Sequence, residues 1–259
     1  MNFEFVDPWH LFLPREPGHV ISLMGSGGKT SLLKSFAAVY AELGVPVVLT
    51  NTTRSEPLSR VPAMEFSRLP SDGAASLAPV IYIHGGVGTD GKWKGLFPEQ
   101  VDELGGLFPE RTVLAEVDGA AKKPVKLFRD GEPVWPGRTS LAIVVMGAGA
   151  VGSATAEILH RFGRVDWPPL ESLEAATVWE WDHALTLLLG AGGYLSQVPA
   201  ELPCVLALTG LEKQRDSIGL FEFVGKAMDH ERFPLAMFCD LTAVPAVIRT
   251  VCLRENEEA

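Results

Sequence analysis

Cysteine, long apolar runs and surplus positive charge are all scarce in this sequence, and each shortage excludes a class of protein. The three cysteines, Cys204, Cys239 and Cys252, lack metal-site spacing and cannot all form disulfides. No apolar run approaches the ~20 residues that a membrane-spanning helix needs. The formal net charge of −10 disfavours nucleic acid as the main partner, because phosphate backbones attract basic surfaces.

The start of the chain also lacks the basic and then apolar regions of a secretory signal. Together with unpaired cysteines, this predicts a cytoplasmic protein with neither a membrane nor a nucleic-acid partner. Hydrophobic residues make up 47% and charged residues 21%, the balance of a compact soluble enzyme. We expect one α/β domain over residues 1–259, with an N-terminal extension at 1–18 and a frayed tail at 254–259.

The apolar runs that are present are short and continuous, which is typical of strands covered on both faces of a parallel sheet. They predict strands at 19–24, 46–50, 80–83, 111–117, 140–146, 204–209 and 234–239. Amphipathic stretches predict helices at 31–43, 99–107, within 173–189 and at 218–229, the last capped by Asp216 or Ser217. Segments 54–79 and 121–139 are rich in proline, glycine and charge and are expected to be loops over a site. The alternation indicates a doubly wound, mostly parallel α/β sheet.

A glycine-rich loop follows the first predicted strand and precedes the first predicted helix. In this setting backbone N–H groups close around phosphate oxygens, and the helix presents its positive N-terminal end. Lys29 is expected to neutralise terminal phosphates, and the Thr30 hydroxyl to ligate Mg²⁺. The alternative, a plain connecting turn, explains the glycines but not Lys-Thr at the helix start. The sequence therefore predicts a P-loop NTPase-like fold whose nucleotide-binding residues are Gly25, Ser26, Gly27, Gly28, Lys29, Thr30 and Ser31.

The loop is shorter than the full P-loop pattern, because Leu23 stands where that pattern requires glycine. What remains is Gly-x-x-Gly-Lys-Thr, which resembles the loop of the Mur ligases more than that of the small GTPases.

Two carboxylates stand at the end of the predicted strand 111–117. Glu116 and Asp118 are two residues apart and so point to the same face of a strand. With Lys29 they form the predicted catalytic set, in which Glu116 joins Thr30 at Mg²⁺ and Asp118 positions the attacking nucleophile. The alternative is a strand end that carries solvated acids.

Further polar residues lie where anionic substrates are expected to bind. The first group follows the second strand, and the others come from a cationic run after Asp118 and from a His-Arg pair. Their alternatives, local turn hydrogen bonds and solvated surface charges, remain open. The candidate anion contacts are Thr52, Thr53, Arg54, Lys126, His160 and Arg161.

The stretch Gly147–Gly152 spells G-x-G-x-x-G before a helix-like segment, 153–162, and taken alone is a dinucleotide fingerprint. The second strand with a terminal acid that should follow is missing, so an NAD-binding oxidoreductase is a weak alternative and a loop at the ligand edge is favoured. After the strand 204–209, Gly210–Lys213 lacks the Asn-Lys-x-Asp pattern of guanine sites. ATP is therefore mildly preferred over GTP.

In combination, five stretches resemble the accessory-protein family linked to selenium-dependent molybdenum hydroxylases, the selenium cofactor biosynthesis group. They are residues 20–30, 50–53, 115–120, Lys126 with 132–136, and His160-Arg161. The resemblance implies a P-loop nucleotide-binding protein, related in fold to nucleotide-driven metal-insertion factors. Two positions depart from the family pattern: Asn51 replaces a threonine, and 209–212 lacks an Asn-Lys-like motif.

The function implied by the resemblance is maturation of a molybdenum hydroxylase, with that enzyme or a selenium-handling protein as partner. We expect a slow Mg²⁺-dependent NTPase that uses ATP or GTP. A small-molecule kinase or Mur-ligase-like ATP-dependent enzyme, and a nucleotide-binding regulator without turnover, remain as alternatives.

Overall fold

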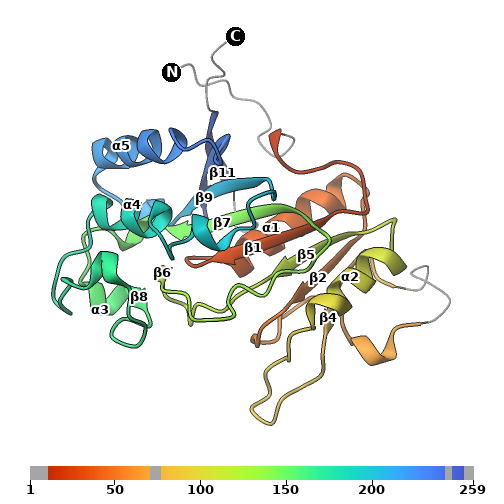
Figure 1. Cartoon of the computed structure of the whole chain (residues 1–259). Coiled ribbons are helices and arrows are strands. Elements are labelled where there is room, and N and C mark those ends of the chain that lie inside the picture. The colour runs from red at the N-terminus through yellow and green to blue at the C-terminus, as the bar shows by residue number, and fades with distance from the viewer. Residues whose placement is uncertain (1–10, 71–76, 243–246, 254–259) are drawn as a thin grey trace.

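The molecule is built around a nine-stranded sheet, seen in a computed structural model that describes residues 11–70, 77–242 and 247–253 (Figure 1). The strand order is β11-β10-β9-β7-β1-β5-β2-β4-β3, and all neighbours are parallel except β10 and β11. A separate parallel pair is formed by β6 (Val125–Lys126) and β8 (Leu159–His160). The strands of the large sheet are β1 (Val20–Gly25), β2 (Val47–Asn51), β3 (Ala63–Glu65), β4 (Val80–His84), β5 (Thr112–Glu116), β7 (Thr139–Gly147), β9 (Cys204–Thr209), β10 (Leu235–Asp240) and β11 (Val247–Leu253).

Helices cover both faces of this sheet. One core contains the buried side of α1 (Lys29–Glu42). The other contains residues of α2 (Pro98–Leu107), α4 (Trp181–Leu189) and α5 (Ser217–Met228). Strands β1, β2 and β9 are buried along their whole length, as expected for strands packed on both sides. The arrangement confirms the predicted doubly wound, mostly parallel α/β sheet of the P-loop NTPase-like type.

The first helix, α1, has the amphipathic pattern from which it was predicted. Its buried residues recur every three or four positions, namely Leu32, Leu33, Phe36, Ala37 and Tyr40. It ends at Glu42, two residues before Gly44, which adopts a φ of +73°, a conformation that glycine accepts without strain. The predicted cap of α5 is also confirmed, because Asp216 accepts a hydrogen bond of 2.9 Å from the Gly219 N–H.

All seven predicted strands are confirmed to within one residue at either end, whereas β3, β6, β8 and β11 were not predicted. Segments 54–79 and 121–139, predicted as loops, contain β3 and β6. Of the predicted extension and tail, residues 1–10 and 254–259 lie outside the described part of the chain. None of the helices in that part has the length and apolar character that crossing a membrane requires.

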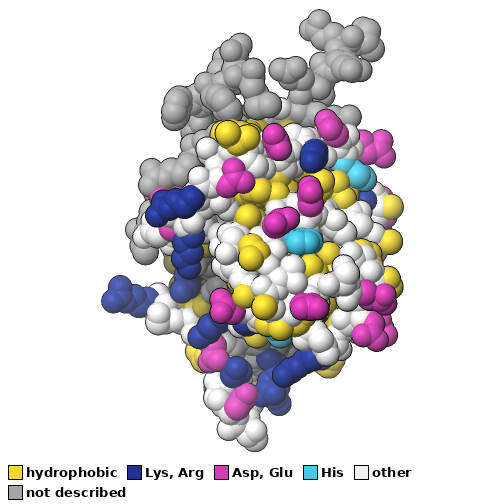
Figure 2. All heavy atoms as spheres, turned by 90° about the vertical axis from the view of Figure 1, so that its left-hand side faces the viewer, with side chains coloured by type: hydrophobic (Ala, Val, Ile, Leu, Met, Phe, Trp, Pro, Cys, Tyr) yellow, Lys and Arg dark blue, Asp and Glu magenta, His cyan; other side chains and the backbone are white. Residues whose placement is uncertain are grey.

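The surface over α4 and α5 mixes acidic and hydrophobic side chains (Figure 2). Val178, Ile218 and Phe221 are exposed there, beside a hollow of about 400 Å³ lined by Trp181 and Glu222. The site described next lies elsewhere, at the carboxyl ends of the central strands.

Candidate functional site

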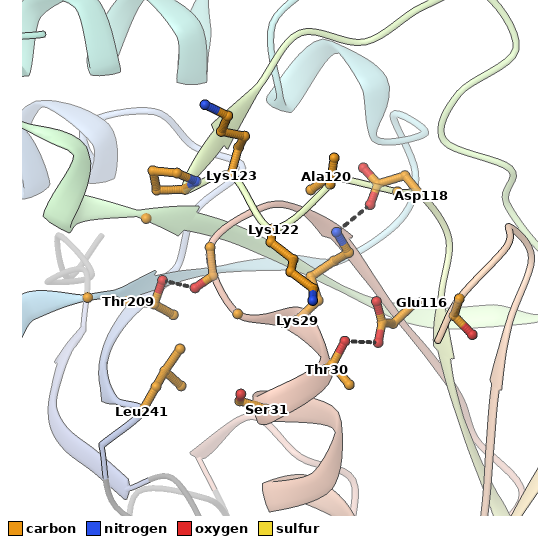
Figure 3. Close-up of a pocket in the computed structure, with 18 of the residues that line it drawn as sticks. Lys29, Thr30, Ser31, Glu116, Asp118, Ala120, Lys122, Lys123, Thr209 and Leu241 are labelled. Atoms are coloured by element: carbon orange, nitrogen blue, oxygen red, sulfur yellow. Dashed lines mark hydrogen bonds and ion pairs between the residues drawn. The ribbon is translucent and has the colours of Figure 1, made fainter. Parts of the chain in front are cut away.

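A cavity of about 910 Å³ opens at the carboxyl ends of β1, β2, β5, β7 and β9 (Figure 3). Ligands of open α/β sheets bind at this edge. The cavity brings together most of the predicted site, while Gly25, Ser26, Thr52, Lys126, His160 and Arg161 do not line it. The predicted residues that line it are Gly27, Gly28, Lys29, Thr30, Ser31, Thr53, Arg54, Glu116 and Asp118.

The glycine loop, Gly25–Thr30, leads into α1 with an uncapped helix start. Gly25, Gly27 and Gly28 adopt φ values of +96°, +97° and +125°, where residues with a side chain are strained. Gly28 is the N-cap residue and supplies no side-chain acceptor, and the first turn of α1 contains no acidic residue. The N–H groups at the start of α1 are therefore available to an anion that enters the cavity.

The loop is pressed against the neighbouring strand β7. A Cβ on Gly25 would lie 2.2 Å from the Val145 carbonyl oxygen, and one on Gly27 would lie 2.7 Å from Gly147 Cα. The Thr209 hydroxyl donates a hydrogen bond to the Gly27 carbonyl. Glycine is thus required on both sides of the contact, which fixes the shape of the loop.

Lys29 and Asp118 form a buried ion pair beneath the loop. Lys29 Nζ lies 2.9 Å from Asp118 Oδ1 and also donates to the Gly25 carbonyl. The other carboxylate oxygen accepts the Gly25 N–H at 2.9 Å and lies 3.1 Å from Lys126 Nζ. With two ammonium groups and a backbone N–H around it, Asp118 positions the loop and Lys29.

A second carboxylate extends this buried ion network away from the cavity. Lys126 is fully buried and donates to Gly119 O at 2.7 Å and to Glu132 Oε2 at 3.0 Å. Arg161 clamps Glu132 through two hydrogen bonds of 2.8 Å each. The sequence pointed to Lys126 and Arg161 as anion contacts, and Glu132 is the anion that they contact here.

Burial and charge shift the pKa values in this network. Burial lowers the pKa of Lys126, against the attraction of Asp118 and Glu132. Burial would raise the pKa of Glu132, but hydrogen bonds from Arg161 and the charge of Lys126 outweigh it and lower that pKa to about 2. Burial, aided by the charges of Arg161 and Lys126, lowers the pKa of His160 to about 4. His160 is therefore neutral at pH 7.

Side-chain oxygen atoms from α1, β2 and β5 lie on one wall of the cavity. The Thr30 hydroxyl donates to Glu116 Oε1 at 2.7 Å, and Asn51 lies beside Glu116 in the β2–β5 register. Burial raises the pKa of Glu116, while the charge of Lys29 and the Thr30 hydrogen bond oppose that rise. Asn51 Oδ1 is buried and has no hydrogen-bond partner among the described residues. Thr52, predicted for this site, instead donates its hydroxyl to Val134 O at 3.0 Å.

A cationic loop, residues 119–124, forms the rim above the glycine loop. Ala121 and Lys122 adopt φ values of +46° and +62°, which are unusual for two consecutive residues with side chains. Lys122 is exposed and points into the cavity toward the glycine loop, whereas the Lys123 ammonium bonds to Ala156 O at 3.4 Å (Figure 3). The Pro124 carbonyl anchors the end of the loop through the Ser26 hydroxyl and the Gly147 N–H.

Tyr194 supports the loop from a distant part of the chain. Its hydroxyl lies 2.8 Å from Ser26 Oγ and accepts the Lys126 N–H at 3.0 Å. No local pattern marks a tyrosine 168 residues away from its partner, so sequence reasoning missed it.

The G-x-G-x-x-G stretch serves packing in this structure. After β7 the chain enters a short turn, η4 (Ala148–Ala150), and then the four-residue helix α3 (Thr155–Ile158) and β8. The helix-like segment 153–162 thus contains only this one helical turn, and the helix that a dinucleotide fingerprint requires does not follow. A Cβ on Gly149 would lie 2.5 Å from Gly210 O. Gly147 and Gly149 line the cavity, as expected for a loop at the ligand edge.

Comparison with known proteins places these features in one family. The family model described as "YqeC protein" matches residues 21–163, more than half of the chain and nearly all of the site. The chain belongs to the YqeC family. The "Uncharacterized protein YqeC" of Escherichia coli (strain K12) is 27% identical over 235 residues, which cover 89% of this chain and 90% of that relative. No solved structure matches.

Proposed function

We propose that this YqeC-family protein binds Mg²⁺ with ATP or GTP and slowly hydrolyses the terminal phosphate, as an accessory factor in enzyme maturation. The observation that carries the proposal is the uncapped start of α1 at the floor of the cavity, with Lys29 and Thr30 as its first residues. Backbone N–H groups there face the cavity with no acidic side chain in the first turn to compete for them.

The residues present suit a magnesium ion carried by the nucleotide. Mg²⁺ prefers oxygen ligands and is usually held by one or two protein oxygens together with substrate phosphates. Thr30 Oγ1 and Glu116 Oε1, already 2.7 Å apart, are such oxygens. They would hold the ion, which would offset the charge of the terminal phosphates.

Each cation of the site has a distinct part in binding the phosphates. Lys29 must exchange its contacts with Asp118 and the Gly25 carbonyl for phosphate oxygens. Asp118 keeps its bonds to the Gly25 N–H and Lys126, so the glycine loop stays in place during that exchange. Lys122 points into the cavity from the rim (Figure 3) and would face the outermost phosphate.

Slow turnover is expected because Asp118, the carboxylate nearest to Lys29, is already held in ion pairs and a hydrogen bond. Asp118 is 1% exposed and contacts two ammonium groups, so it has little freedom to orient water.

Phosphate release from ATP and GTP, measured with Glu116→Gln and Asp118→Asn, tests this assignment. Glu116→Gln removes a proposed Mg²⁺ ligand, so it is expected to reduce turnover by at least ~10-fold and to weaken nucleotide binding in Mg²⁺. Asp118→Asn is expected to weaken binding as well, because it loosens Lys29 and the glycine loop. Fast turnover by the isolated wild-type protein would contradict the proposal.

A phosphoryl-transfer enzyme is a second candidate, favoured by one observation. The cavity continues beyond Glu116 to Thr53, Leu58, Tyr82 and Lys92, which leaves room for a second small substrate. With that substrate added, a kinase would form the phosphorylated substrate and release little phosphate, whereas a ligase would release phosphate only once the substrate is present. The same assay therefore separates the candidates.

The partner in this proposal is a selenium-dependent molybdenum hydroxylase or a protein that handles its selenium. Its support is the resemblance carried by residues 20–30, 115–120 and 132–136, which apart from Val20 lie within the segment that matches the family model. We expect a strain that lacks this protein to contain the hydroxylase polypeptide with little activity. Normal hydroxylase activity in that strain would refute the partner assignment while leaving nucleotide binding untouched.

A further inference from the structure

One polar atom in the cavity wall is left without a partner by everything described so far. Asn51 is 1% exposed at the end of β2, and its Oδ1 accepts no hydrogen bond from the described residues. A buried acceptor of this kind is destabilising unless a ligand or ordered water satisfies it.

The orientation of the Asn51 amide is fixed by its neighbour. Asn51 Nδ2 donates to the Thr53 carbonyl, and rotating the amide would place Oδ1 against that carbonyl oxygen. The backbone is held as well, because Leu96 N donates to Asn51 O at 2.8 Å and Thr52 N donates to Glu116 O at 2.9 Å. The fold therefore holds the unpartnered oxygen in a fixed position in the cavity wall.

The position of this oxygen identifies the kind of ligand. Asn51 pairs with Glu116 across β2 and β5, and Glu116 accepts from Thr30. All three residues line the same cavity. A wall made of a hydroxyl, a carboxylate and an amide oxygen suits a hydrated divalent cation, whose bound waters are strong hydrogen-bond donors.

We infer that Asn51 Oδ1 is the third protein acceptor of the magnesium site, beside Thr30 and Glu116, and that it orients a water bound to the ion. The inference rests on the proposed function and deepens it. Asn51 therefore increases the gain in nucleotide affinity that Mg²⁺ provides. Removing the Asn51 side chain reduces this gain and leaves the affinity for nucleotide without metal unchanged.

Calorimetric titration with ATP, once in Mg²⁺ and once in EDTA, measures that coupling as the ratio of the two dissociation constants. Removing an outer acceptor of a metal site typically costs 10–100-fold in metal affinity. Asn51→Leu is expected to reduce the ratio about tenfold with the EDTA value unchanged. Asn51→Asp, which adds a negative charge beside the ion, is expected to raise the ratio.

Lys92→Ala is the matched control, because Lys92 lines the same cavity but pairs with Glu56 at the surface. It should leave the ratio unchanged. A ratio within twofold of wild type in both Asn51 variants would overturn the inference while the proposed function stands. A wild-type protein that binds neither ATP nor GTP in either condition would instead refute the proposed function. Asn51→Asp decides the matter if Asn51→Leu fails to fold, as monitored by thermal unfolding.

Discussion

Lys29 illustrates how a single side chain prepares the site for a ligand that it does not yet contact. At 5% exposure its ammonium is held by Asp118 and by the carbonyl of Gly25. Both contacts lie at the base of the loop, and binding of the proposed nucleotide would require the ammonium to turn from them to phosphate oxygens. The charge of Lys29 is compensated meanwhile, which is the condition for burying it.

At the same scale, Lys122 is expected to contact the outermost phosphate of bound ATP. Lys122→Ala should weaken ATP binding up to about fivefold, since an exposed ion pair contributes at most about 1 kcal/mol. AMP, which has no outer phosphate, should bind equally well to both proteins. Fluorescence titration with the two nucleotides checks this difference.

Lys123→Ala is the control for this prediction, because the Lys123 ammonium is bonded to backbone carbonyls of Ala156 and Glu157 outside the phosphate path. Equal losses of ATP and AMP affinity in Lys122→Ala would place Lys122 away from the outer phosphate.

Glu132 gives a prediction about pH. Its pKa is about 2 in the folded protein, below the ordinary value of 4.5, so its charge stabilises the fold above pH 4.5 and that stabilisation is lost as pH falls toward 2. Glu132→Gln should cost roughly 3–5 kcal/mol at pH 7, the usual effect of removing one partner of a buried ion pair. The difference from wild type should shrink steadily below pH 4.5.

Urea unfolding of both proteins between pH 7 and pH 3 measures this effect. Glu201→Gln, which changes an exposed acid, should stay within about 0.5 kcal/mol of wild type throughout. A Glu132→Gln penalty that is independent of pH would show that packing, and not charge, is what Glu132 contributes.

At the scale of elements, the approach of the glycine loop to β7 decides the shape of the site. Gly147 is the point of contact, because its own Cβ would lie 2.6 Å from Pro124 Cβ while Gly27 abuts it from the other side. Gly147→Ala should destabilise the protein by about 1–3 kcal/mol, the usual penalty of overpacking, and should weaken ATP binding. Thermal unfolding and calorimetry measure the two effects.

Gly225→Ala in α5 is expected to have the opposite effect on the stability of the protein. No heavy atom lies within 4 Å of the added methyl group, so the better helix propensity of alanine should stabilise the protein by up to about 1 kcal/mol. Nucleotide affinity should be unchanged. If Gly147→Ala proved as harmless as Gly225→Ala, the claim that the close approach of the loop to β7 requires glycine at position 147 would be wrong.

Sequence patterns predicted the elements whose information is local. Continuous apolar runs gave the seven core strands, and glycine before Lys29-Thr30 gave the loop at the start of α1. The edge strands β3 and β11 and the short pair β6 and β8 carry no such run, because their stability depends on neighbours far away in the chain. The segment 153–162 looked helical, but its backbone turns into β8 beside Lys126.

The same distinction holds within the site. Residues of the glycine loop and the acids after β5 are marked by their neighbours in sequence. Glu132, Tyr194 and Asn51 acquire their roles only through folding, which brings them to Lys126, to Ser26 and to Glu116. Charge alone could not show that Arg161 faces Glu132 and not the cavity.

At the scale of the whole molecule, the cavity differs in charge balance from the chain as a whole. The formal net charge of the chain is −10, whereas the cavity is lined by six cations and five acids: Lys29, Arg54, Lys92, Lys122, Lys123 and Lys213, and Glu56, Glu116, Asp118, Glu157 and Glu212. Cations on a negatively charged molecule lower the local repulsion of a polyanion at this one place. The central claim is that this polyanion is a nucleoside triphosphate.

Calorimetric titration of the purified protein with ATP, GTP and NAD in Mg²⁺, beside the Lys29→Ala variant, tests that claim most directly. The account predicts that one of the triphosphates binds and that Lys29→Ala weakens its binding at least tenfold, about 1.4 kcal/mol or more. Binding of NAD that survives the substitution, with no triphosphate bound by the wild-type protein, would contradict the account and return attention to Gly147–Gly152.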